Sequence, residues 1–442
     1  MTVAAGVTYG PEPTPGDLLL TGGRIIDPSR GLDLVGDVLI RDGVIAHAGS
    51  AISAPDGARV RDVRGLVVAP GLIDVHVHLR EPGREDVETI ESGARAAAAG
   101  GFTAVCAMPN TKPVTDNQAA VGFIIRQAQR AAAARVYPIG AISVGQNGEA
   151  LAEMGEMVAA GAVAVSDDGR PVMSSHLMRT ALEYARTFDI PVVDHCEDMA
   201  LAHGGSMNEG KVSAMLGLRG IPDEAEEIMV IRDILLARRT GGHVHLCHMS
   251  TRGSVELIRW GKERGVRVTA EVCPHHFTLT DERVGHFDTN AKMNPPLRTQ
   301  EDVDALIAAV KDGTIDLICT DHAPHHYDEK ERAFAEAPNG IVGLETSLGV
   351  TITALVATGV IDLATMIERM SCAPARIWGL PGGTLAAGHP GDVTVFDPTA
   401  VWTVDPARFR SKGRNTPWGG VSLTGAPRLT IVGGGIVFDA AA

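Results

Sequence analysis

The sequence predicts a (β/α)8 barrel, an α/β TIM-like fold, together with a small β-sandwich built from both ends of the chain. Between about residues 67 and 380, β-like and helix-like stretches alternate, and eight such units in one domain indicate the barrel. Polar residues follow several predicted strands, which is where a barrel of this kind places its chemistry. A doubly wound sheet is the competing architecture, but no Gly-x-Gly-x-x-Gly motif follows the first predicted strand.

Length, charge and cysteine use restrict the class of protein. The 442 residues suffice for one large α/β domain and a smaller one. The formal net charge is -15, so nucleic acid is not an expected partner. Apolar runs stop short of the ~20 residues of a membrane span and the N-terminus lacks a signal-peptide pattern, so we expect a cytoplasmic protein with no membrane partner. The six cysteines form no Cys-x-x-Cys pair, so we expect reduced thiols.

The two ends of the chain carry short β-type runs. Residues 1–16 are rich in Gly, Pro and Thr, and we expect a flexible N-terminal extension there. Residues 17–65 contain several such runs, with Arg41-Asp-Gly43 as a hairpin turn, and residues 381–442 repeat this style. Neither segment has enough strands for a stable domain alone. We therefore predict one composite β-sandwich from these two segments, beside a barrel of residues 66–380.

The strands predicted for the barrel are short apolar runs, and Ala-rich or amphipathic stretches separate most of them. We place the strands at 72–78, 103–108, 136–142, 162–166, 191–195, 243–248, 267–272 and 315–320. We place the principal helices at 91–99, 118–133, 175–188, 224–237 and 303–311. In such a barrel, the C-terminal ends of all eight strands open onto one face.

The first predicted strand contains a His-x-His pair. Because side chains alternate along a strand, His76 and His78 lie on one face, and Arg80 continues that direction into a polar loop. Two imidazoles on one face can bind a metal ion. Two hydrogen-bonded core histidines would give the same short pattern, so the other strand ends decide between these interpretations.

Residue types that bind metals occupy four other predicted strand ends. They are found in Ser166-Asp-Asp-Gly169, Asp194-His-Cys-Glu197, Cys247-His-Met-Ser-Thr251 and Cys319-Thr-Asp-His-Ala-Pro-His325. Four histidines and two carboxylates thus meet at the predicted mouth. These ligands suit Zn²⁺ or a neighbouring first-row ion, and six are too many for one tetrahedral site. We expect two metal ions that share a bridging carboxylate, an arrangement that binds hydroxide and polarises a carbonyl for hydrolysis.

A second His-x-His pair, His243 and His245, is expected to be structural. The period of two places both side chains on the face opposite His248, towards the surrounding helices.

With these residues assembled, the chain resembles the dihydroorotase family, of the cytoplasmic bacterial type, in the amidohydrolase superfamily. The resemblance covers nearly the whole chain and implies reversible hydrolysis of the cyclic amide of (S)-dihydroorotate to N-carbamoyl-L-aspartate in de novo pyrimidine (UMP) biosynthesis. It also implies a homodimer or a complex with aspartate carbamoyltransferase. The motifs that carry it are Asp74-Val-His-Val-His-Leu-Arg-Glu-Pro-Gly83, Ala107-Met-Pro-Asn-Thr111, Ser166-Asp-Asp-Gly169, Asp194-His-Cys-Glu-Asp198, Cys247-His-Met-Ser-Thr251, Lys292-Met-Asn-Pro-Pro-Leu297 and Thr320-Asp-His-Ala-Pro-His325.

The resemblance further implies a set of site residues. His76, His78 and Asp321 would hold one Zn²⁺ ion and His195 and His248 a second, with Asp168 bridging the two. Asp321 would be the catalytic general acid and base, acting with a metal-bridged hydroxide. The residues implied in substrate binding are His78, Arg80, Asn110, Asn294, His325, Asn339 and Gly340.

Two departures from related patterns are informative. Many binuclear amidohydrolases bridge their metals with a carboxylated lysine on the fourth strand, yet this chain has no lysine between Lys112 and Lys211, so a carboxylate must replace it. The residues alone leave Asp167 and Asp168 open, and the resemblance favours Asp168. Asn339 stands where the family often has Phe, so we expect an aromatic lid contact to be missing.

Arg80 separates the implied activity from its alternatives. The planar guanidinium fork suits the exocyclic carboxylate of dihydroorotate. One alternative is another cyclic-amide hydrolase, such as a dihydropyrimidinase, hydantoinase or allantoinase, which usually carries the strand-four lysine and acts on neutral rings. The other is an inactive scaffold homologue, in which metal ligands would be lost. The sequence leaves open the identity and occupancy of the metals, the oligomeric state and which loops act as lids.

Overall fold

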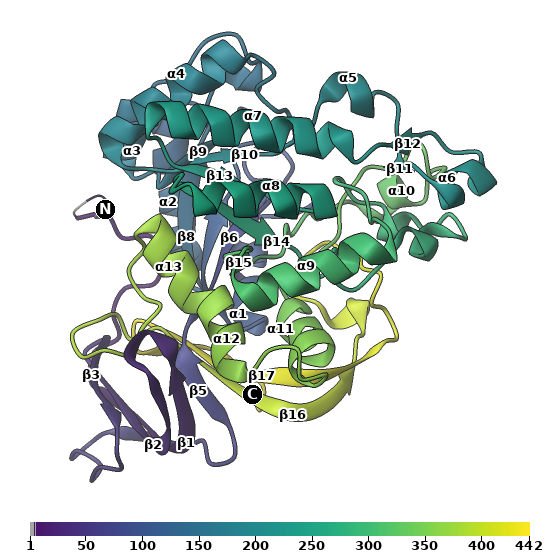
Figure 1. The fold of residues 1–442 in the computed structure, drawn as a ribbon. Helices are drawn as coiled ribbons and strands as arrows, with labels where there is room; N and C mark the ends of the chain where they lie inside the picture. The colour runs from purple at the N-terminus through teal and green to yellow at the C-terminus, as the bar shows by residue number, and fades with distance from the viewer. Residues whose placement is uncertain (1–3, 5) are drawn as a thin grey trace.

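The computed structural model describes residue 4 and residues 6–442, and its central element is a parallel eight-stranded barrel surrounded by helices (Figure 1). The strands follow one another around the barrel in chain order, from β6 (Leu72–Val77) to β15 (Leu317–Ile318). A bridge between Val77 and His322 joins the first strand to the last, and the amide of His78 donates to the carbonyl of His322 at 2.9 Å. The predicted barrel is confirmed.

All eight predicted barrel strands are present, and most are shorter than predicted. Besides β6 and β15 they are β7 (Phe102–Ala107), β8 (Arg135–Gly140), β9 (Ala164–Ser166), β10 (Val192–Asp194), β13 (Val244–Leu246) and β14 (Val268–Val272). The strands β6, β10 and β13 end one or two residues before a histidine that we had placed inside the strand. These histidines therefore lie at the point where strand turns into loop.

Helices cover the outside of the barrel, and all five principal helices predicted from the sequence are present. The helices are α1 (Ile90–Ala99), α2 (Gln118–Ala131), α3 (Met154–Ala160), α4 (Ser175–Ala185), α5 (Met199–Ala202), α6 (Lys211–Leu216), α7 (Glu224–Thr240), α8 (Arg252–Glu263), α9 (Gln300–Asp312), α10 (Tyr327–Lys330), α11 (Ser347–Thr351), α12 (Leu363–Ile367) and α13 (Ala373–Trp378).

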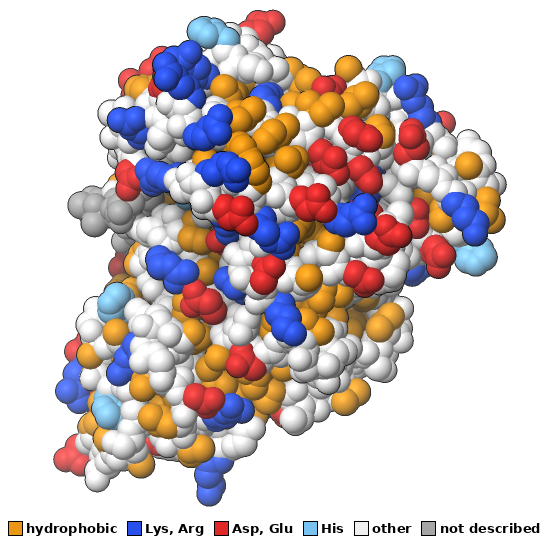
Figure 2. All heavy atoms as spheres, viewed as in Figure 1, with side chains coloured by type: hydrophobic (Ala, Val, Ile, Leu, Met, Phe, Trp, Pro, Cys, Tyr) orange, Lys and Arg blue, Asp and Glu red, His pale blue; other side chains and the backbone are white. Residues whose placement is uncertain are grey.

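On the face shown in Figure 2, acidic and basic side chains are interspersed. None of the helices in the described part of the chain combines the length and apolar composition that crossing a bilayer requires.

Side-chain caps fix where helices begin next to the mouth of the barrel. The Thr89 hydroxyl accepts from the Ser92 amide at 3.1 Å, and the Ser92 hydroxyl accepts from the Thr89 amide at 2.9 Å, which is a capping box before α1. Thr251 caps α8 in the same way, through the amide of Ser254 at 3.1 Å. Each of these loops thus ends in a polar cap at the first turn of its helix.

Both chain ends contribute to a second sheet of eight strands, the terminal sheet, which lies below the barrel in Figure 1. Its order is β18-β17-β16-β5-β1-β2-β3, with β4 paired to β1. The strands are β1 (Asp17–Asp27), β2 (Leu32–Arg41), β3 (Val44–Gly49), β4 (Arg59–Asp62), β5 (Val67–Pro70), β16 (Val393–Thr403), β17 (Ser422–Val432) and β18 (Gly435–Asp439). The predicted turn at Asp42 and Gly43, both with positive φ, joins β2 to β3. The two chain ends meet at β5, which pairs with β1 on one side and β16 on the other.

The N-terminal segment packs against the barrel. Residues 1–3 and 5 of the extension predicted to be flexible lie outside the described residues. Tyr9 is buried against Tyr137, with 4.6 Å between ring centroids, and its hydroxyl donates to the carbonyl of Gly161 at 3.1 Å. This part of the segment is therefore held against the barrel by the Tyr9 ring. The composition of the segment alone does not indicate that this ring belongs to the core.

A long insert between β10 and α7 carries α5, α6 and a two-stranded sheet of β11 (Met207–Asn208) and β12 (Gly220–Ile221). The buried Arg298 ties the insert to the barrel, because its guanidinium donates to the Asn208 side chain at 3.0 Å and to the Ile221 carbonyl at 2.7 Å.

Candidate metal centre and active site

Six side chains from five strand ends converge at the mouth of the barrel. They come from β6, β9, β10, β13 and β15 or from the residues that directly follow these strands, and each is at most 5% exposed. The six residues are His76, His78, Asp168, His195, His248 and Asp321. The structure thus brings together every residue expected to bind metal.

One half of the cluster joins two imidazoles to two carboxylates. His76 Nε2 lies 3.5 Å from Asp168 Oδ1 and 3.4 Å from Asp321 Oδ1. His78 Nε2 lies 2.9 Å from Asp321 Oδ1 and 3.4 Å from Asp168 Oδ2. Donor atoms bound at about 2.0–2.2 Å to one tetrahedral ion lie about 3.3–3.6 Å apart, so most of these separations suit a shared ion.

The other half is built from His195 and His248. His195 Nδ1 lies 2.9 Å from His248 Nε2, and the two nitrogens lie 3.6 and 3.7 Å from Asp168 Oδ1. Asp168 therefore faces both pairs of imidazoles, which is the position that a bridging ligand needs. Asp167, the other candidate, turns away and accepts from the amides of Ile142 at 2.8 Å and Ser143 at 3.1 Å.

The donor set fits divalent ions. His76 Nε2 and Asp168 Oδ1 are buried and have no hydrogen-bond partner among the described residues. A buried polar atom left unsatisfied costs about 1–3 kcal/mol, and coordination to a metal removes that cost. Imidazole nitrogens with carboxylate oxygens are also the ligands that first-row divalent ions accept.

Electrostatics at the cluster favour positive charge. Burial alone would lower the pKa of His76, but the carboxylates of Asp321 and Glu271 hold it well above its ordinary value. Burial alone would raise the pKa of Asp321, but the imidazoles of His76 and His78 lower it to about 2. The pKa of His195 is raised to about 10, because its bonds to Asp168 and Glu197 outweigh burial. The carboxylates that attract protons here would attract metal cations equally.

The sequence reasoning missed the carboxylates behind the imidazoles. Glu271 of β14 is fully buried, with Oε1 at 2.6 Å from His76 Nδ1 and Oε2 at 3.0 Å from His245 Nε2. Glu197 Oε2 lies 3.4 Å from His195 Nε2. A carboxylate on the far nitrogen fixes the ring and directs its other nitrogen to a metal. The available signal for Glu271 was a carboxylate inside a predicted strand that also contains Val268, Ala270 and Val272.

The expected orientation of His245 was wrong. Its bond to Glu271, which also holds His76, places His245 inside the barrel and not towards the helices. The alternation argument failed because β13 ends at Leu246 and His248 has a φ of 33°, so the chain turns before His248 and the period of two no longer applies.

Strained backbone marks the mouth. Arg80, His248 and Asp321 have φ values of 59°, 33° and 46°, in the left-handed region that non-glycine residues rarely adopt. Such conformations cost about 1–3 kcal/mol each and persist where the surrounding structure determines them, typically at functional sites.

A cavity of about 210 Å³ opens beside the cluster. It is lined by the residues expected to bind substrate, which are His78, Arg80, Asn110, Asn294, His325, Asn339 and Gly340. Asn110 Oδ1 lies 2.9 Å from His78 Nδ1, and Asn294 Nδ2 donates to Glu197 at 3.1 Å. These contacts orient two amides along the cavity wall.

Arg80 supplies the cavity with a cation. Burial lowers its pKa to about 10, which leaves it protonated at neutral pH. Its Nε donates to the carbonyl of Pro324 at 3.2 Å, and no carboxylate of the described chain lies within ion-pairing distance of the guanidinium. A partly buried cation without a carboxylate partner favours an anionic ligand.

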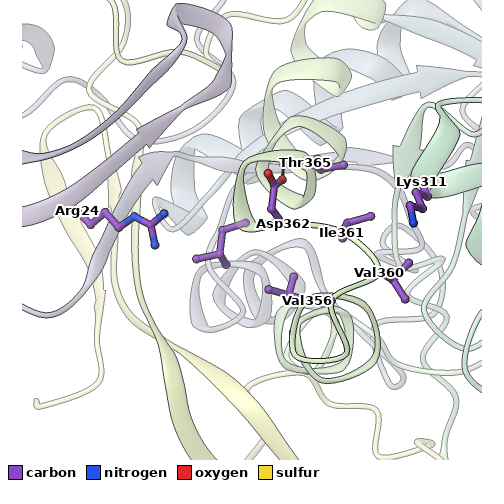
Figure 3. A pocket seen from close by; sticks show the side chains of 9 residues that line it. Arg24, Lys311, Val356, Val360, Ile361, Asp362 and Thr365 are labelled. Carbon is purple, nitrogen blue, oxygen red and sulfur yellow. Dashed lines mark hydrogen bonds between the residues drawn. The ribbon is translucent and has the colours of Figure 1, made fainter.

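A larger hollow of about 620 Å³, shown in Figure 3, lacks comparable chemistry. Apolar side chains such as Val356 and Val360 form much of its wall, and Arg24, which belongs to β1 of the terminal sheet, is paired with Asp33 at 2.8 Å. The smaller cavity at the barrel mouth is therefore the candidate active site.

Comparisons with known proteins indicate the family to which the chain belongs. Residues 65–254 match the family model described as dihydro-orotase-like. Dihydroorotases of Pelobacter propionicus and Geobacter metallireducens are each 53% identical to this chain over 422 residues, covering 96% of it and 99% of their own length. The dihydroorotase of Anaeromyxobacter dehalogenans is 55% identical over 424 residues, covering 96% of this chain and 98% of its own.

Solved structures share the fold. The L-hydantoinase of Arthrobacter aurescens has a TM-score of 0.86 at 26% identity, with 96% of both chains covered. A dihydropyrimidinase of Brevibacillus agri has a TM-score of 0.83 at 23% identity, with 96% of this chain and 95% of its own covered.

A (β/α)8 barrel with candidate metal ligands gathered at its mouth is typical of the cyclic amidohydrolases, and this protein is an enzyme of that class. Its identity to curated relatives extends over nearly the whole chain. The chain belongs to the dihydroorotase family.

Proposed function

We propose that the protein catalyses the reversible hydrolysis of the cyclic amide of (S)-dihydroorotate to N-carbamoyl-L-aspartate, with ring closure as the biosynthetic direction in pyrimidine synthesis. The observation that carries the choice of substrate is Arg80, a partly buried cation without a carboxylate partner in a cavity that also reaches the metal-ligand cluster. Dihydroorotate carries the carboxylate that this cation needs, whereas dihydrouracil, hydantoin and allantoin present neutral rings.

The proposed cofactor is a pair of Zn²⁺ ions or other first-row divalent ions. His76, His78 and Asp321 would hold one ion, His195 and His248 the other, and Asp168 both. When bound, such ions activate water at neutral pH and polarise a carbonyl oxygen. The donor separations and the two orphaned donor atoms described above support this assignment.

Asp321 is the proposed catalytic proton carrier. Its carboxylate lines the cavity beside His78, at 2.9 Å from the imidazole, and is ionised at neutral pH. It can therefore accept a proton from the attacking water and pass it to the ring nitrogen as the amide bond breaks, provided that both atoms lie within hydrogen-bond reach.

Recognition of the substrate is assigned to the polar side chains around the cavity. The two parallel N–H groups of the Arg80 guanidinium suit the exocyclic carboxylate. Asn110, Asn294 and His325 present further donors and acceptors towards the cavity, and Asn339 and Gly340 close its wall. A site that leaves buried polar groups unpaired with the wrong ligand discriminates strongly against that ligand.

A substrate panel with metal analysis tests this proposal. Dihydroorotate, dihydrouracil, hydantoin and allantoin are compared on one preparation, and its metal content is measured. We expect kcat/KM for dihydroorotate to exceed the others by about 100-fold or more, since such a site can reject ligands by about 10⁴-fold. We also expect about two metal ions per chain, with activity lost on chelation and regained on adding Zn²⁺. Preference for a neutral ring would overturn the proposal in favour of another cyclic-amide hydrolase, and metal binding without turnover would favour an inactive scaffold.

We further propose that the protein is a cytoplasmic homodimer and that it associates with aspartate carbamoyltransferase, an enzyme whose product is carbamoyl aspartate. Light scattering on the purified protein, alone and mixed with aspartate carbamoyltransferase, tests both statements. A monomeric mass would overturn the first, and unchanged masses in the mixture would overturn the second.

A further inference from the structure

Residues 410–415 return from the terminal sheet to the mouth of the barrel, and we name them the mouth strap. They lie between β16 and β17 in the chain. Two carboxylates bind the strap at its start. Glu345 accepts from the amides of Arg410 at 2.8 Å and Ser411 at 3.1 Å, and the buried Glu88 accepts from the hydroxyl of Ser411. The strap is thus fixed to the barrel domain independently of the terminal sheet.

Asn415, at the end of the strap, joins two loops of the mouth. Its Nδ2 donates to the carbonyls of Ala323 and Gly340, both at 2.9 Å, and its Oδ1 accepts from the amide of His325 at 3.1 Å. The residue is only 3% exposed. Both donor hydrogens and the acceptor oxygen of the side chain therefore form hydrogen bonds with loop backbone.

The two loops joined by Asn415 carry residues that line the cavity. His325 lies in the loop that follows β15, and Gly340 lies in the loop between α10 and α11. The loops also touch directly, because His325 Nε2 lies 2.8 Å from the carbonyl of Asn339. Arg80 is bound to the first loop through the carbonyl of Pro324. One amide side chain thus supports three residues of the proposed substrate site.

Close packing holds the strap against the same loops. A Cβ atom on Gly413 would lie 2.7 Å from Pro324 Cβ and 2.8 Å from Val342 Cγ1, so no side chain fits there. Glycine is required at this point because the strap backbone lies directly on Pro324, the residue whose carbonyl receives Arg80.

The metal-ligand side of the mouth is held by contacts that do not include Asn415. The amide of Thr320, next to Asp321, donates to Asp74 at 3.0 Å, and His322 Nε2 lies 3.2 Å from Glu88. Neither contact involves Asn415. A change at Asn415 should therefore disturb substrate binding more than the position of the metal ligands.

We propose that Asn415 is a positioning residue for substrate recognition. It acts through His325, Gly340 and, by way of Pro324, Arg80, and it shapes the cavity before substrate arrives. Holding recognition groups in their bound arrangement lowers the free-energy cost of binding. The inference rests on the proposed function, because it assigns Asn415 to the binding of the acidic ring.

The test is Asn415→Asp, which preserves size and the Oδ1 acceptor but replaces the donor to two carbonyls by a second acceptor. We expect KM for dihydroorotate to rise about 10-fold or more, with kcat within about 3-fold and metal content unchanged, since two buried hydrogen bonds are lost. Asn117→Asp is the matched control, because Asn117 is an exposed cap of α2 and Asp caps equally well. This control should leave KM unchanged.

Two further variants exclude a merely structural effect. Gly413→Ala displaces the strap without altering its hydrogen-bonding groups, and it should raise KM with the same small effect on kcat even where Asn415→Asp fails to fold. In a His325→Ala background, the part of the KM increase that Asn415→Asp causes through His325 should vanish, because residues that act through one another are not additive.

Three results would overturn the inference. They are a KM that changes less than about 2-fold in both strap variants, a fall in kcat accompanied by metal loss, and additive effects of Asn415→Asp and His325→Ala. A wild-type protein that does not turn over dihydroorotate would overturn the proposed function itself. An active wild-type protein with an unchanged KM in the variants would overturn this inference alone.

Discussion

Glu271 holds His76 through a contact of 2.6 Å between its Oε1 and the imidazole Nδ1, and both side chains are fully buried. Because Nδ1 is engaged, Nε2 is the nitrogen that faces Asp168 and Asp321. Burial would raise the pKa of Glu271, but the imidazoles of His76 and His245 hold it well below its usual range. The supporting carboxylate is thus ionised at neutral pH.

Replacing Glu271 by Gln should weaken metal binding. The amide keeps the size of the side chain but loses the charge, and loss of such a supporting partner typically costs about 10–100-fold in metal affinity. Metal retained after dialysis against a graded series of chelator concentrations measures the effect. Glu301→Gln, on the exposed side of α9, is the control and should retain wild-type metal content. Equal retention in the two variants would show that Glu271 does not support the metal centre.

Arg80→Met should change the choice of substrate. The variant keeps an extended side chain and removes the only charge that the proposal assigns to the substrate carboxylate. We expect kcat/KM for dihydroorotate to fall about 100-fold or more, because charged hydrogen bonds contribute about 1.5–3 kcal/mol each and the guanidinium can form two. Activity on dihydrouracil should fall much less, so the ratio of the two values is the measurement. A uniform loss on both substrates would assign Arg80 a structural role.

Asp321→Asn should abolish turnover while leaving the fold intact. The amide cannot accept the proton from water, and general acid–base groups contribute about 10²–10⁴-fold to rate. Circular dichroism and turnover on the same sample measure the two properties. Asp198→Asn is the control, because Asp198 only caps the short helix α5. Near-normal turnover in Asp321→Asn would contradict the proton-transfer role.

The barrel and the ligand cluster could be predicted because local pattern encodes both. Apolar runs separated by helical stretches define the strands, and the topology of a barrel places all strand ends on one face. His76 and Asp321 are 245 residues apart, yet each is placed at the mouth by its own strand, without knowledge of the other.

The supporting contacts could not be predicted, because they depend on which distant side chains meet. Glu271 and His76 are partners across the barrel interior, and Asn415 reaches Ala323 from the loop between β16 and β17 of the terminal sheet. Neither pairing has a local signature. His248 shows the complementary failure, since a left-handed residue after the strand end changes the direction of the side chain, and alternation cannot anticipate it.

Glu345, which binds the start of the mouth strap, should make stability depend on pH. Burial outweighs its bonds from the amides of Arg410 and Ser411 and raises its pKa from an ordinary 4.5 to about 7. The folded state binds a proton on Glu345 more tightly than the unfolded state does. The stabilisation that Glu345 contributes is therefore fully present below pH 4.5 and is lost as the pH rises through 7. Urea unfolding from about pH 5 to 8 should therefore show a decline in the free energy of unfolding of the wild type. This decline should be smaller in Glu345→Gln. The control is Glu256→Gln, on the exposed face of α8, which should show the same decline as the wild type. Parallel curves for the wild type and Glu345→Gln would contradict this assignment, because the amide does not titrate.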